Sequence, residues 1–257
     1  MKREEARVRA EKWTMLMSQR YDDMIAKARQ CTKVYNDKDV QVPQETVGKD
    51  TDIVLVPMDS VSAIHKYKEG KTAVLNFASY KNPGGGFIRG MMAQEESLCH
   101  HSYLYNVLKA FSSYYAWNGN NLNSGFYTNR ALYTPSVLFD ETTRCDVITC
   151  AAPNASRMIR YKTGEEEKNK VELIKRILFV LNIAAAEKVD TLILGAYGCG
   201  VFKQNPEDVA RLFKYYLENN FAGCFNKVIF AIPDESGVNY QVFKEHLGYN
   251  AKEDRLQ

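Results

Sequence analysis

Residues 72–97 read TAVLNFASYKNPGGGFIRGMMAQEES, and the order of patterns in this stretch decides the fold class. Thr72 to Ala78 is a short apolar run typical of a buried strand, and three glycines follow it before a helical pattern begins near Gln94. A second stretch repeats this order, because the apolar run Thr191 to Ala196 leads through a glycine-rich loop into a helix predicted over Pro206 to Asn219. Strands that alternate with helices in this way favour an α/β fold with helices on both faces of a sheet.

The remaining periodicity predicts further elements around these two stretches. One amphipathic helix is predicted over residues 1–35, with apolar positions at Trp13, Leu16, Met17, Met24 and Ile25. A polar loop is predicted from Asn36 to Asp50, and one long helix from Leu98 to Tyr115. Additional strands are predicted over Ile53 to Val56, Leu132 to Phe139, Val147 to Ala152 and Lys227 to Ile232, and additional helices over Val171 to Ala185 and Val238 to Leu247. Pro135 within its predicted strand suits a sheet edge or a bend.

Length and composition exclude several classes of protein. The chain has 257 residues, of which 45% are hydrophobic and 25% charged, which excludes a disordered chain, a collagen-like chain and a coiled coil. The net charge of +3 does not predict general nucleic-acid binding, so an anionic ligand must be held locally. The longest nearly apolar run, Ile177 to Ala186, is too short to cross a bilayer.

The N-terminus and the cysteines indicate the compartment. The N-terminus is charged and is not a secretory signal, and the six cysteines form no C-x-x-C pair. Free thiols and a cytoplasmic location are therefore expected.

The triple glycine Gly84–Gly86 predicts a loop whose backbone approaches a ligand closely. Residues without Cβ atoms permit positive φ, and successive N–H groups can converge on an anion. No Gly-Lys-Ser/Thr sequence follows, so the loop is not a P-loop. Glu95 and Glu96 fall at the start of the following helix, where the helix dipole favours acids without any further role. Because neighbouring residues on a helix point about 100° apart, one carboxylate can face the ligand while the other braces the loop.

The electrostatic balance of this acidic pair is left open by the sequence. Mutual repulsion and partial burial would raise one pKa toward the range useful for a general acid. The positive end of the helix dipole would oppose that rise in pKa.

The second glycine-rich loop, Gly195 to Pro206, has two interpretations. It runs from a strand into a helix N-terminus, which suits phosphate binding, but its glycine spacing is not the dinucleotide fingerprint and a tight turn without a ligand is equally compatible. Two such loops in one sheet imply a ligand with a phosphate or diphosphate. Cys199 is interpreted as a small residue rather than a nucleophile, because no histidine is close to it in the sequence. Tyr197 and Phe202 are interpreted as packing or stacking residues.

Other polar and aromatic residues do not form a recognisable site. His100 and His101 are interpreted as surface or packing residues, and the sequence holds no histidine spacing typical of zinc ligands, so no metal site is expected. Tyr127 and Tyr133 are compatible both with a place near a base and with the core.

Taken together, the two loops resemble the signature of a known family. Three glycines, seven intervening residues and Gln94-Glu95-Glu96 are similar to the signature loop of the poly(ADP-ribose) glycohydrolases, and LNFASYKNP at 75–83, VITCAAPN at 147–154 and GAYGCGVF at 195–202 resemble the microbial branch. The resemblance runs from about residue 50 to 235. It implies a macrodomain, a three-layer α/β/α fold with a central mixed β-sheet and ADP-ribose in a cleft. Residues 1–257 would then form a single domain, with 1–48 as an N-terminal helical extension packed on a macrodomain core of 49–250.

The resemblance also implies roles for individual residues. By position in the motif, Glu96 would be the catalytic acid and Glu95 would orient the ligand or the loop. The implied substrate-binding residues are Asn82, Gly84, Gly85, Gly86, Phe87, Gln94, Ala196, Tyr197, Gly198, Cys199, Gly200, Val201 and Phe202.

The implied reaction is hydrolysis of the ribose–ribose O-glycosidic bonds of poly(ADP-ribose), which releases ADP-ribose. Such a reaction passes through an oxocarbenium-like state, in which Glu96 would protonate the leaving hydroxyl and then take a proton from water. No metal or redox cofactor is required. The expected partners are the polymer or an ADP-ribosylated protein, without a membrane or a specific nucleic-acid sequence.

Two alternative functions remain at this point. One is a macrodomain that binds ADP-ribose without cleaving it, and the other is a hydrolase that removes mono-ADP-ribose from proteins. An intact Gln94-Glu95-Glu96 favours an enzyme, because a binding module does not need a positioned acid.

Overall fold

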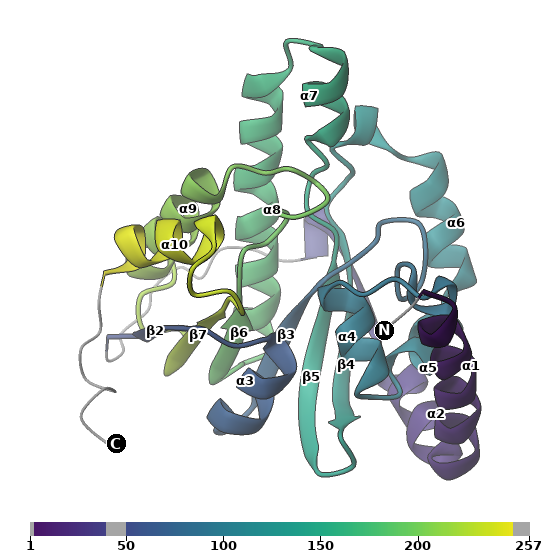
Figure 1. The fold of residues 1–257 in the computed structure, drawn as a ribbon. Coiled ribbons are helices and arrows are strands. Elements are labelled where there is room, and N and C mark those ends of the chain that lie inside the picture. Colours follow the sequence, from purple (N-terminus) through teal and green to yellow (C-terminus); the bar gives the residue numbers. More distant parts are fainter. Residues whose placement is uncertain (1–2, 40–49, 249–257) are drawn as a thin grey trace.

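The computed structural model describes residues 3–39 and 50–248 and contains a seven-stranded mixed sheet (Figure 1). The strand order across the sheet is β1-β4-β5-β3-β6-β7-β2. β4 runs antiparallel to both of its neighbours, and the other adjacent strands are parallel. The strands are β1 (Lys33–Asn36), β2 (Asp52–Val56), β3 (Thr72–Phe77), β4 (Arg130–Phe139), β5 (Thr143–Cys150), β6 (Thr191–Leu194) and β7 (Lys227–Ala231).

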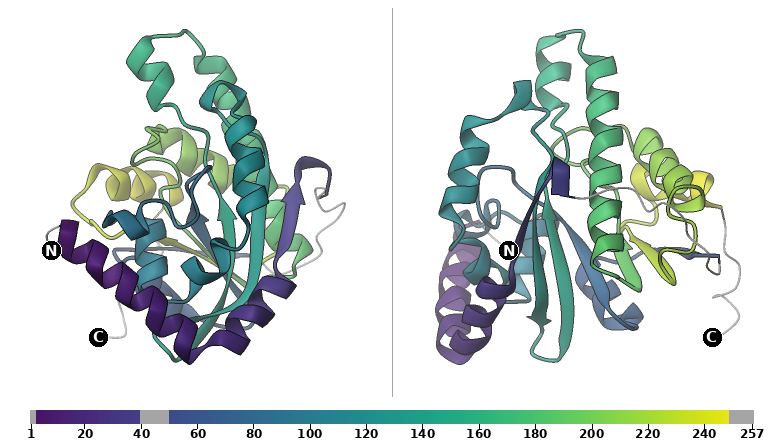
Figure 2. Two further views of the ribbon diagram at one scale, coloured as in Figure 1. Left: turned by 90° about the vertical axis from the view of Figure 1, so that its right-hand side faces the viewer. Right: turned by 180° about the vertical axis from the view of Figure 1, so that it is seen from behind.

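The helices cover both faces of this sheet (Figures 1 and 2). They are α1 (Arg3–Arg20), α2 (Asp22–Cys31), α3 (Ser60–Tyr67), α4 (Gln94–His100), α5 (Leu104–Leu108), α6 (Ser112–Asn120), α7 (Ser156–Tyr161), α8 (Glu166–Ala186), α9 (Pro206–Glu218) and α10 (Val238–Leu247). α8, α9 and α10 form one layer, and α1 to α6 form the other. Within the described ranges, no helix combines the length and the apolar character needed to span a membrane.

Two hydrophobic cores lie on the two sides of the sheet, as the period-two alternation of strand side chains requires. In β3, Ala73 and Leu75 belong to the core beneath α8 and α9, whereas Val74 belongs to the core beneath α1 to α6. The expected three-layer α/β/α arrangement with a central mixed sheet is therefore confirmed.

The single helix predicted over residues 1–35 is wrong. α1 ends at Arg20, Tyr21 has non-helical backbone angles, and α2 then begins with two acids in its first turn. α1 buries Ala6, Ala10 and the predicted apolar position Met17, whereas Leu16, another predicted apolar position, is exposed. Residues 33–36 form the edge strand β1, so this segment is not helical throughout. The predicted polar loop begins with a short 3₁₀ turn at Asp37–Asp39, and its remaining residues 40–49 lie outside the described ranges.

The long helix predicted from Leu98 to Tyr115 is also wrong, because three shorter helices replace it. Ser102 follows α4, where it forms an isolated bridge with Phe139. Its hydroxyl donates to Leu98 O at 2.7 Å and accepts from Leu104 N at 3.1 Å, so a side chain takes the place of a backbone helix bond. The spacing of apolar residues continues through the break, which is why the pattern resembled one helix.

Pro135 lies at a bulge in β4, beyond the last residue of β4 that pairs with β1. β1 pairs with β4 as far as Tyr133, and the register of β4 with β5 shifts between Thr134 and Val137. Ser136 has a φ of 58°, in the left-handed region. The predicted bend is therefore confirmed.

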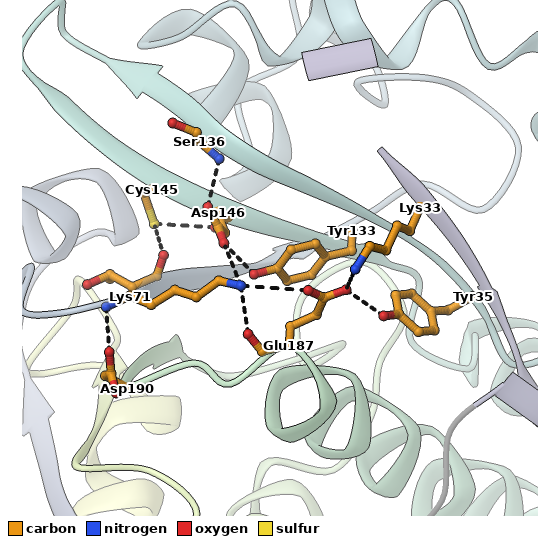
Figure 3. A network of polar contacts seen from close by, with 10 residues as sticks. Lys33, Tyr35, Lys71, Tyr133, Ser136, Cys145, Asp146, Glu187 and Asp190 are labelled. Atoms are coloured by element: carbon orange, nitrogen blue, oxygen red, sulfur yellow. Dashed lines mark hydrogen bonds and ion pairs between the residues drawn. The ribbon is translucent and has the colours of Figure 1, made fainter. Parts of the chain in front are cut away.

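A polar network ties the edge strand β1 to the amino ends of β3 and β5 (Figure 3). Asp146 and Glu187 are its two buried carboxylates. Lys71 lies between them, with Nζ 3.8 Å from Asp146 Oδ2 and 3.6 Å from Glu187 Oε2. Lys33 and Tyr35 of β1 donate to Glu187 at 2.8 and 2.5 Å, and Tyr133 and Ser136 of β4 donate to Asp146. Every carboxylate of this network therefore has a cation and further hydrogen-bond donors beside it.

Candidate active site

A cavity of about 460 Å³ opens at the carboxyl ends of the parallel strands. This is the end of an α/β sheet at which ligands bind. The cavity is lined by Asp59, Ser60, Phe77, Met92, Ala93, Gln94, Ser97, Ala152, Ala196, Tyr197, Gly198, Gly200, Val201, Phe202, Ala231, Ile232, Pro233 and Asn239. The second glycine-rich loop and the start of α4 therefore meet at one site, whereas the triple glycine lies outside the cavity lining.

The triple-glycine loop is wrapped around the two glutamates of α4. Gly84 and Gly85 have φ values of 63° and 61°, which glycine adopts without strain. A Cβ on Gly85 would lie 2.6 Å from Glu96 Oε1 and 2.8 Å from Glu95 Oε2, so a side chain there would collide with both carboxylates. Asn82 closes the turn, because its carbonyl accepts a hydrogen bond from Gly85 N at 3.0 Å. The glycines thus allow the backbone to approach the acidic pair closely.

Both carboxylates are buried and both accept hydrogen bonds from the loop backbone. Glu96 accepts from Gly86 N at 2.7 Å and from Ala93 N at 2.9 Å, the latter bond closing the first turn of α4. Glu95 accepts from Ser79 N at 2.7 Å and from Asn76 Nδ2 at 3.3 Å. Each carboxylate therefore holds a different part of the loop.

Burial has a large effect on the ionisation of Glu95. Burial raises the pKa of Glu95 to about 8, and the nearby charge of Glu96 adds to the rise. The hydrogen bonds from Ser79 and Asn76 act in the opposite direction but do not cancel it. Glu95 therefore carries a proton near neutral pH, although the family motif assigns the acid role to its neighbour.

Gln94 lines the cavity, but its amide group serves to position α4. Its Oε1 accepts from Phe77 N at 2.9 Å, and its Nε2 donates to Leu75 O at 2.8 Å and to Ser60 Oγ at 3.1 Å. These bonds fasten the first residue of the helix to the end of β3. They set the direction in which Glu95 and Glu96 project.

The second loop brings two glycines, Gly198 and Gly200, to the cavity. Gly198 has a φ of 77°, and a Cβ there would lie 2.7 Å from the Cβ of Ala152. Tyr197 is fully buried and donates its hydroxyl to Cys150 O at 3.0 Å. Gly200 is exposed, and no atom lies within 4 Å of the place where its Cβ would be. Burial raises the pKa of Cys199 to about 12, so this residue is a protonated thiol at neutral pH.

Phe202 lies at the edge of the cavity within an aromatic cluster. Its ring meets Tyr127 at a centroid distance of 5.9 Å, and Tyr127 stacks on Tyr80 at 4.2 Å. Tyr133 is instead a buried residue whose hydroxyl donates to Asp146 at the far end of the sheet. Of the two tyrosines left open by the sequence, Tyr127 therefore lies beside the site and Tyr133 belongs to the core.

The side chain of Phe87 does not face the cavity. It is fully buried against His100, at a centroid distance of 4.6 Å, and its backbone N–H donates to Gly84 O at 3.0 Å. The predicted contact between Phe87 and a substrate therefore stays a prediction for its backbone alone. His100 is a packing residue as expected, and burial lowers its pKa to about 4.

Four polar cavity residues have no counterpart among the residues predicted from the sequence: Asp59, Ser60, Ser97 and Asn239. Asp59 caps α3, and its Oδ1 accepts from Val61 N at 2.9 Å and from Ser62 N at 3.0 Å. Burial acts to raise the pKa of Asp59, but these hydrogen bonds outweigh it and hold the pKa below its usual value. The available signal was positional, because residues that follow β2 and β7 reach the same sheet end as the two glycine-rich loops.

No group of three or more histidine, cysteine or acidic side chains within residues 3–39 and 50–248 is arranged to hold a metal ion.

Comparisons with known proteins agree on one family. Residues 6–142 match the family model of the microbial-type PARG catalytic domain. The poly(ADP-ribose) glycohydrolase of Thermomonospora curvata is 28% identical with a TM-score of 0.85, covering 95% of this chain and 99% of that one. The Deinococcus radiodurans enzyme, solved in complex with ADP-ribose, is 32% identical with a TM-score of 0.79, covering 87% and 96%. The Thermomonospora curvata enzyme bound to the inhibitor ADP-HPD is 29% identical with a TM-score of 0.83, covering 94% and 99%.

A comparison with curated protein sequences found no match. The family model nevertheless spans more than half of the chain, and the Deinococcus radiodurans structure matches at 32% identity over 87% of it. Its fold, its signature loop and these two matches together mean that this chain belongs to the microbial-type poly(ADP-ribose) glycohydrolase family.

Proposed function

We propose that this protein hydrolyses the ribose–ribose O-glycosidic bonds of poly(ADP-ribose) and that the cavity holds the ADP-ribose unit that is released. The observation that carries the proposal is the buried pair Glu95 and Glu96, enclosed by the triple-glycine loop at the cavity end of the sheet. Family membership and the ADP-ribose complex of the Deinococcus radiodurans relative support the choice of substrate.

We assign proton transfer to Glu96. Both carboxylates lie within 3 Å of the same point, the Cβ position of Gly85, at 2.6 and 2.8 Å. The raised pKa of Glu95 keeps a proton available beside Glu96 near neutral pH. Glu96 would pass it to the leaving hydroxyl as the bond to the sugar breaks, and would then accept a proton from the attacking water. Glu95 would hold the loop and retain the proton between turnovers.

The second loop and the triple glycine would bind the diphosphate and the adjoining ribose. Gly198 and Gly200 line the cavity and leave the backbone accessible, which suits contacts from N–H groups to phosphate oxygens. The proposed binding set also includes Asn82, Gly84, Gly85, Gly86, Gln94, Ala196, Tyr197, Cys199, Val201 and Phe202. In this set, Tyr197 and Cys199 would contribute backbone atoms only.

The decisive variant is Glu96→Gln. The amide is nearly isosteric with the carboxyl group but has no acidic proton, so we expect turnover of labelled polymer to fall by about 100- to 10,000-fold. Affinity for ADP-ribose, measured by calorimetry, should stay within about threefold, because catalysis rather than binding has lost its group. Near-wild-type turnover in Glu96→Gln would remove this residue from the mechanism.

Two controls separate this proposal from its alternatives. If the wild-type protein binds ADP-ribose but releases none from the polymer, it is a binding module. If it cleaves only singly modified protein and leaves the polymer intact, it is a mono-ADP-ribosyl hydrolase. A cytoplasmic location is part of the proposal, because all six cysteines are free thiols and disulfides form in oxidising compartments.

A further inference from the structure

Arg176 is a fully buried arginine whose hydrogen-bond acceptors are all uncharged. It projects from α8, and its Nε donates to Asn129 Oδ1 at 2.6 Å. Its two Nη atoms donate to the carbonyls of Ala151 and Phe126. None of the ion pairs formed within residues 3–39 and 50–248 includes Arg176.

A buried cation without an anionic partner is costly for a protein to retain. The carboxylate connected to this network is Asp37, which accepts from Asn129 Nδ2 at 2.7 Å. Asp37 is exposed, and the Asn129 side chain separates it from the guanidinium. The interior therefore keeps a positive charge that the acidic residues of the described chain do not neutralise by direct contact.

This charge lies directly behind the wall of the cavity. Ala151, which accepts from Arg176, precedes the cavity residue Ala152. Tyr197 also lines the cavity, and its hydroxyl donates to Cys150 O and interacts with the guanidinium. The charge is thus one residue layer away from the space where the second loop opens.

The face of α8 that carries Arg176 also holds the second loop in place. Asn169 lies seven residues earlier, on the same side of the helix. Its side chain exchanges hydrogen bonds with Gln204, at 3.0 and 2.8 Å, and Gln204 donates to Pro153 O at 2.8 Å. One helix therefore fixes both backbone segments that meet at this wall.

We propose that Arg176 is a positioning residue that holds the end of β5 and supplies an uncompensated positive charge to the anion bound in the cavity. The inference rests on the proposed function, which requires a diphosphate beside the second loop. In the low-dielectric interior such a charge acts over a longer range than in water, and salt screens it little. An arginine suits this place because its planar fork can serve two carbonyls while the charge is retained at any physiological pH.

The double variant Asp37→Asn/Asn129→Asp tests the role of the charge. It moves one carboxylate from the surface onto Arg176, reverses the direction of the hydrogen bond between positions 37 and 129, and leaves the net charge of the protein unchanged. We expect the Kd for ADP-ribose to rise about tenfold, as expected for neutralising one nearby buried charge. The melting temperature should equal or exceed that of the wild type, because a buried cation has gained its partner. Asp37→Asn alone is the matched control and should leave both values unchanged.

Arg176→Lys should change stability rather than affinity, the reverse of the double variant. It keeps the charge but loses the fork, so we expect a lower melting temperature with a Kd that rises less than about threefold. An unchanged Kd in the folded double variant would overturn the proposal, and so would a loss of affinity that parallels a loss of thermal stability. A tenfold or larger loss of affinity in Arg176→Lys would do the same. If the wild-type protein itself failed to bind ADP-ribose in this titration, the proposed function would fail instead.

Discussion

At the amino ends of β3 and β5, two lysines meet two buried carboxylates. At the carboxyl ends, two carboxylates and an arginine are buried without an ion pair to any residue that the structure describes. Lys71 contacts both Asp146 and Glu187 in the first region. In the second region, Glu95 and Glu96 both lie close to Gly85, and the described acceptors of Arg176 are neutral. The difference teaches that this fold pairs its charges where only stability is at stake. It leaves them unpaired where a substrate can use them, at a cost in stability.

The largest expected effect comes from removing a buried carboxylate at the amino ends of β3 and β5. Asp146 accepts hydrogen bonds from the Tyr133 hydroxyl and from Ser136 N, so Asp146→Ala leaves both buried donors without a partner. We expect the free energy of unfolding to fall by about 3 kcal/mol. Urea denaturation measures this loss, and polymer turnover by the folded variant should remain within about twofold of wild type. Asp146→Asn, which keeps an acceptor, should lose less stability. A large loss of turnover would show that catalysis at the carboxyl ends of the strands depends on the charge network at their amino ends.

The second prediction concerns how the stability contributed by Glu95, at the carboxyl ends of the strands, depends on pH. Because the pKa of Glu95 is raised to about 8, the folded protein keeps a proton that the unfolded chain releases at the ordinary pKa of a carboxyl group. The free energy of unfolding must therefore fall as the pH rises through this window. Relative to Glu95→Gln, the wild type should lose roughly 3 kcal/mol of stability between about pH 5 and about pH 8. Parallel stability curves for the two proteins would mean that Glu95 ionises normally.

A smaller effect is expected from filling the open side of the second loop. Nothing lies within 4 Å of a Cβ on Gly200, so Gly200→Val should fold normally. The branched side chain would stand between the backbone and a diphosphate, and we expect ADP-ribose affinity to fall about tenfold. Gly119 has equally open surroundings in α6, so Gly119→Val is the matched control for calorimetry. Equal affinities in the two variants would remove the second loop from the binding site.

The smallest effect should come from Cys199→Ser. Burial raises the pKa of this thiol to about 12, so almost no thiolate exists at neutral pH. Polymer turnover and ADP-ribose affinity should both stay within about twofold of wild type. A loss of several orders of magnitude in single-turnover cleavage, with binding kept, would identify Cys199 as a nucleophile.

The parts of the fold that are set by local patterns could be predicted from the sequence. The apolar runs that became β2, β3, β6 and β7 are continuous, as buried parallel strands require, and α10 was predicted with its observed bounds. β1 escaped prediction because Lys33–Asn36 is mostly exposed and is a strand only through its pairing with β4. The break at Ser102 escaped it because the helical spacing of apolar residues continues across the bridge to Phe139.

The candidate site also has a part that could be predicted from the sequence and a part that could not. The glycine-rich loops and the acidic pair are contiguous in sequence, so their chemistry was visible before the structure. The raised pKa of Glu95 was not visible, because it depends on burial by segments that are distant in the chain. Arg176 carried no signal at all, since an arginine among the charged residues of a helix usually lies at the surface. Asp59 and Asn239 were missed because they join the cavity only through the order of the strands.

The strand order also has a consequence for how the chain is made. β1 and β2 are consecutive in the sequence, yet they lie at opposite edges of the sheet (Figure 1). Lys33 pairs with Tyr133 and Asp52 pairs with Lys227, so both strands leave the ribosome long before their partners exist. Contacts this distant in sequence form slowly, and strands that wait for them remain exposed to pairing with other chains. The sheet is therefore completed only after β7 has been synthesised, and its two edges cannot be secured strand by strand during translation.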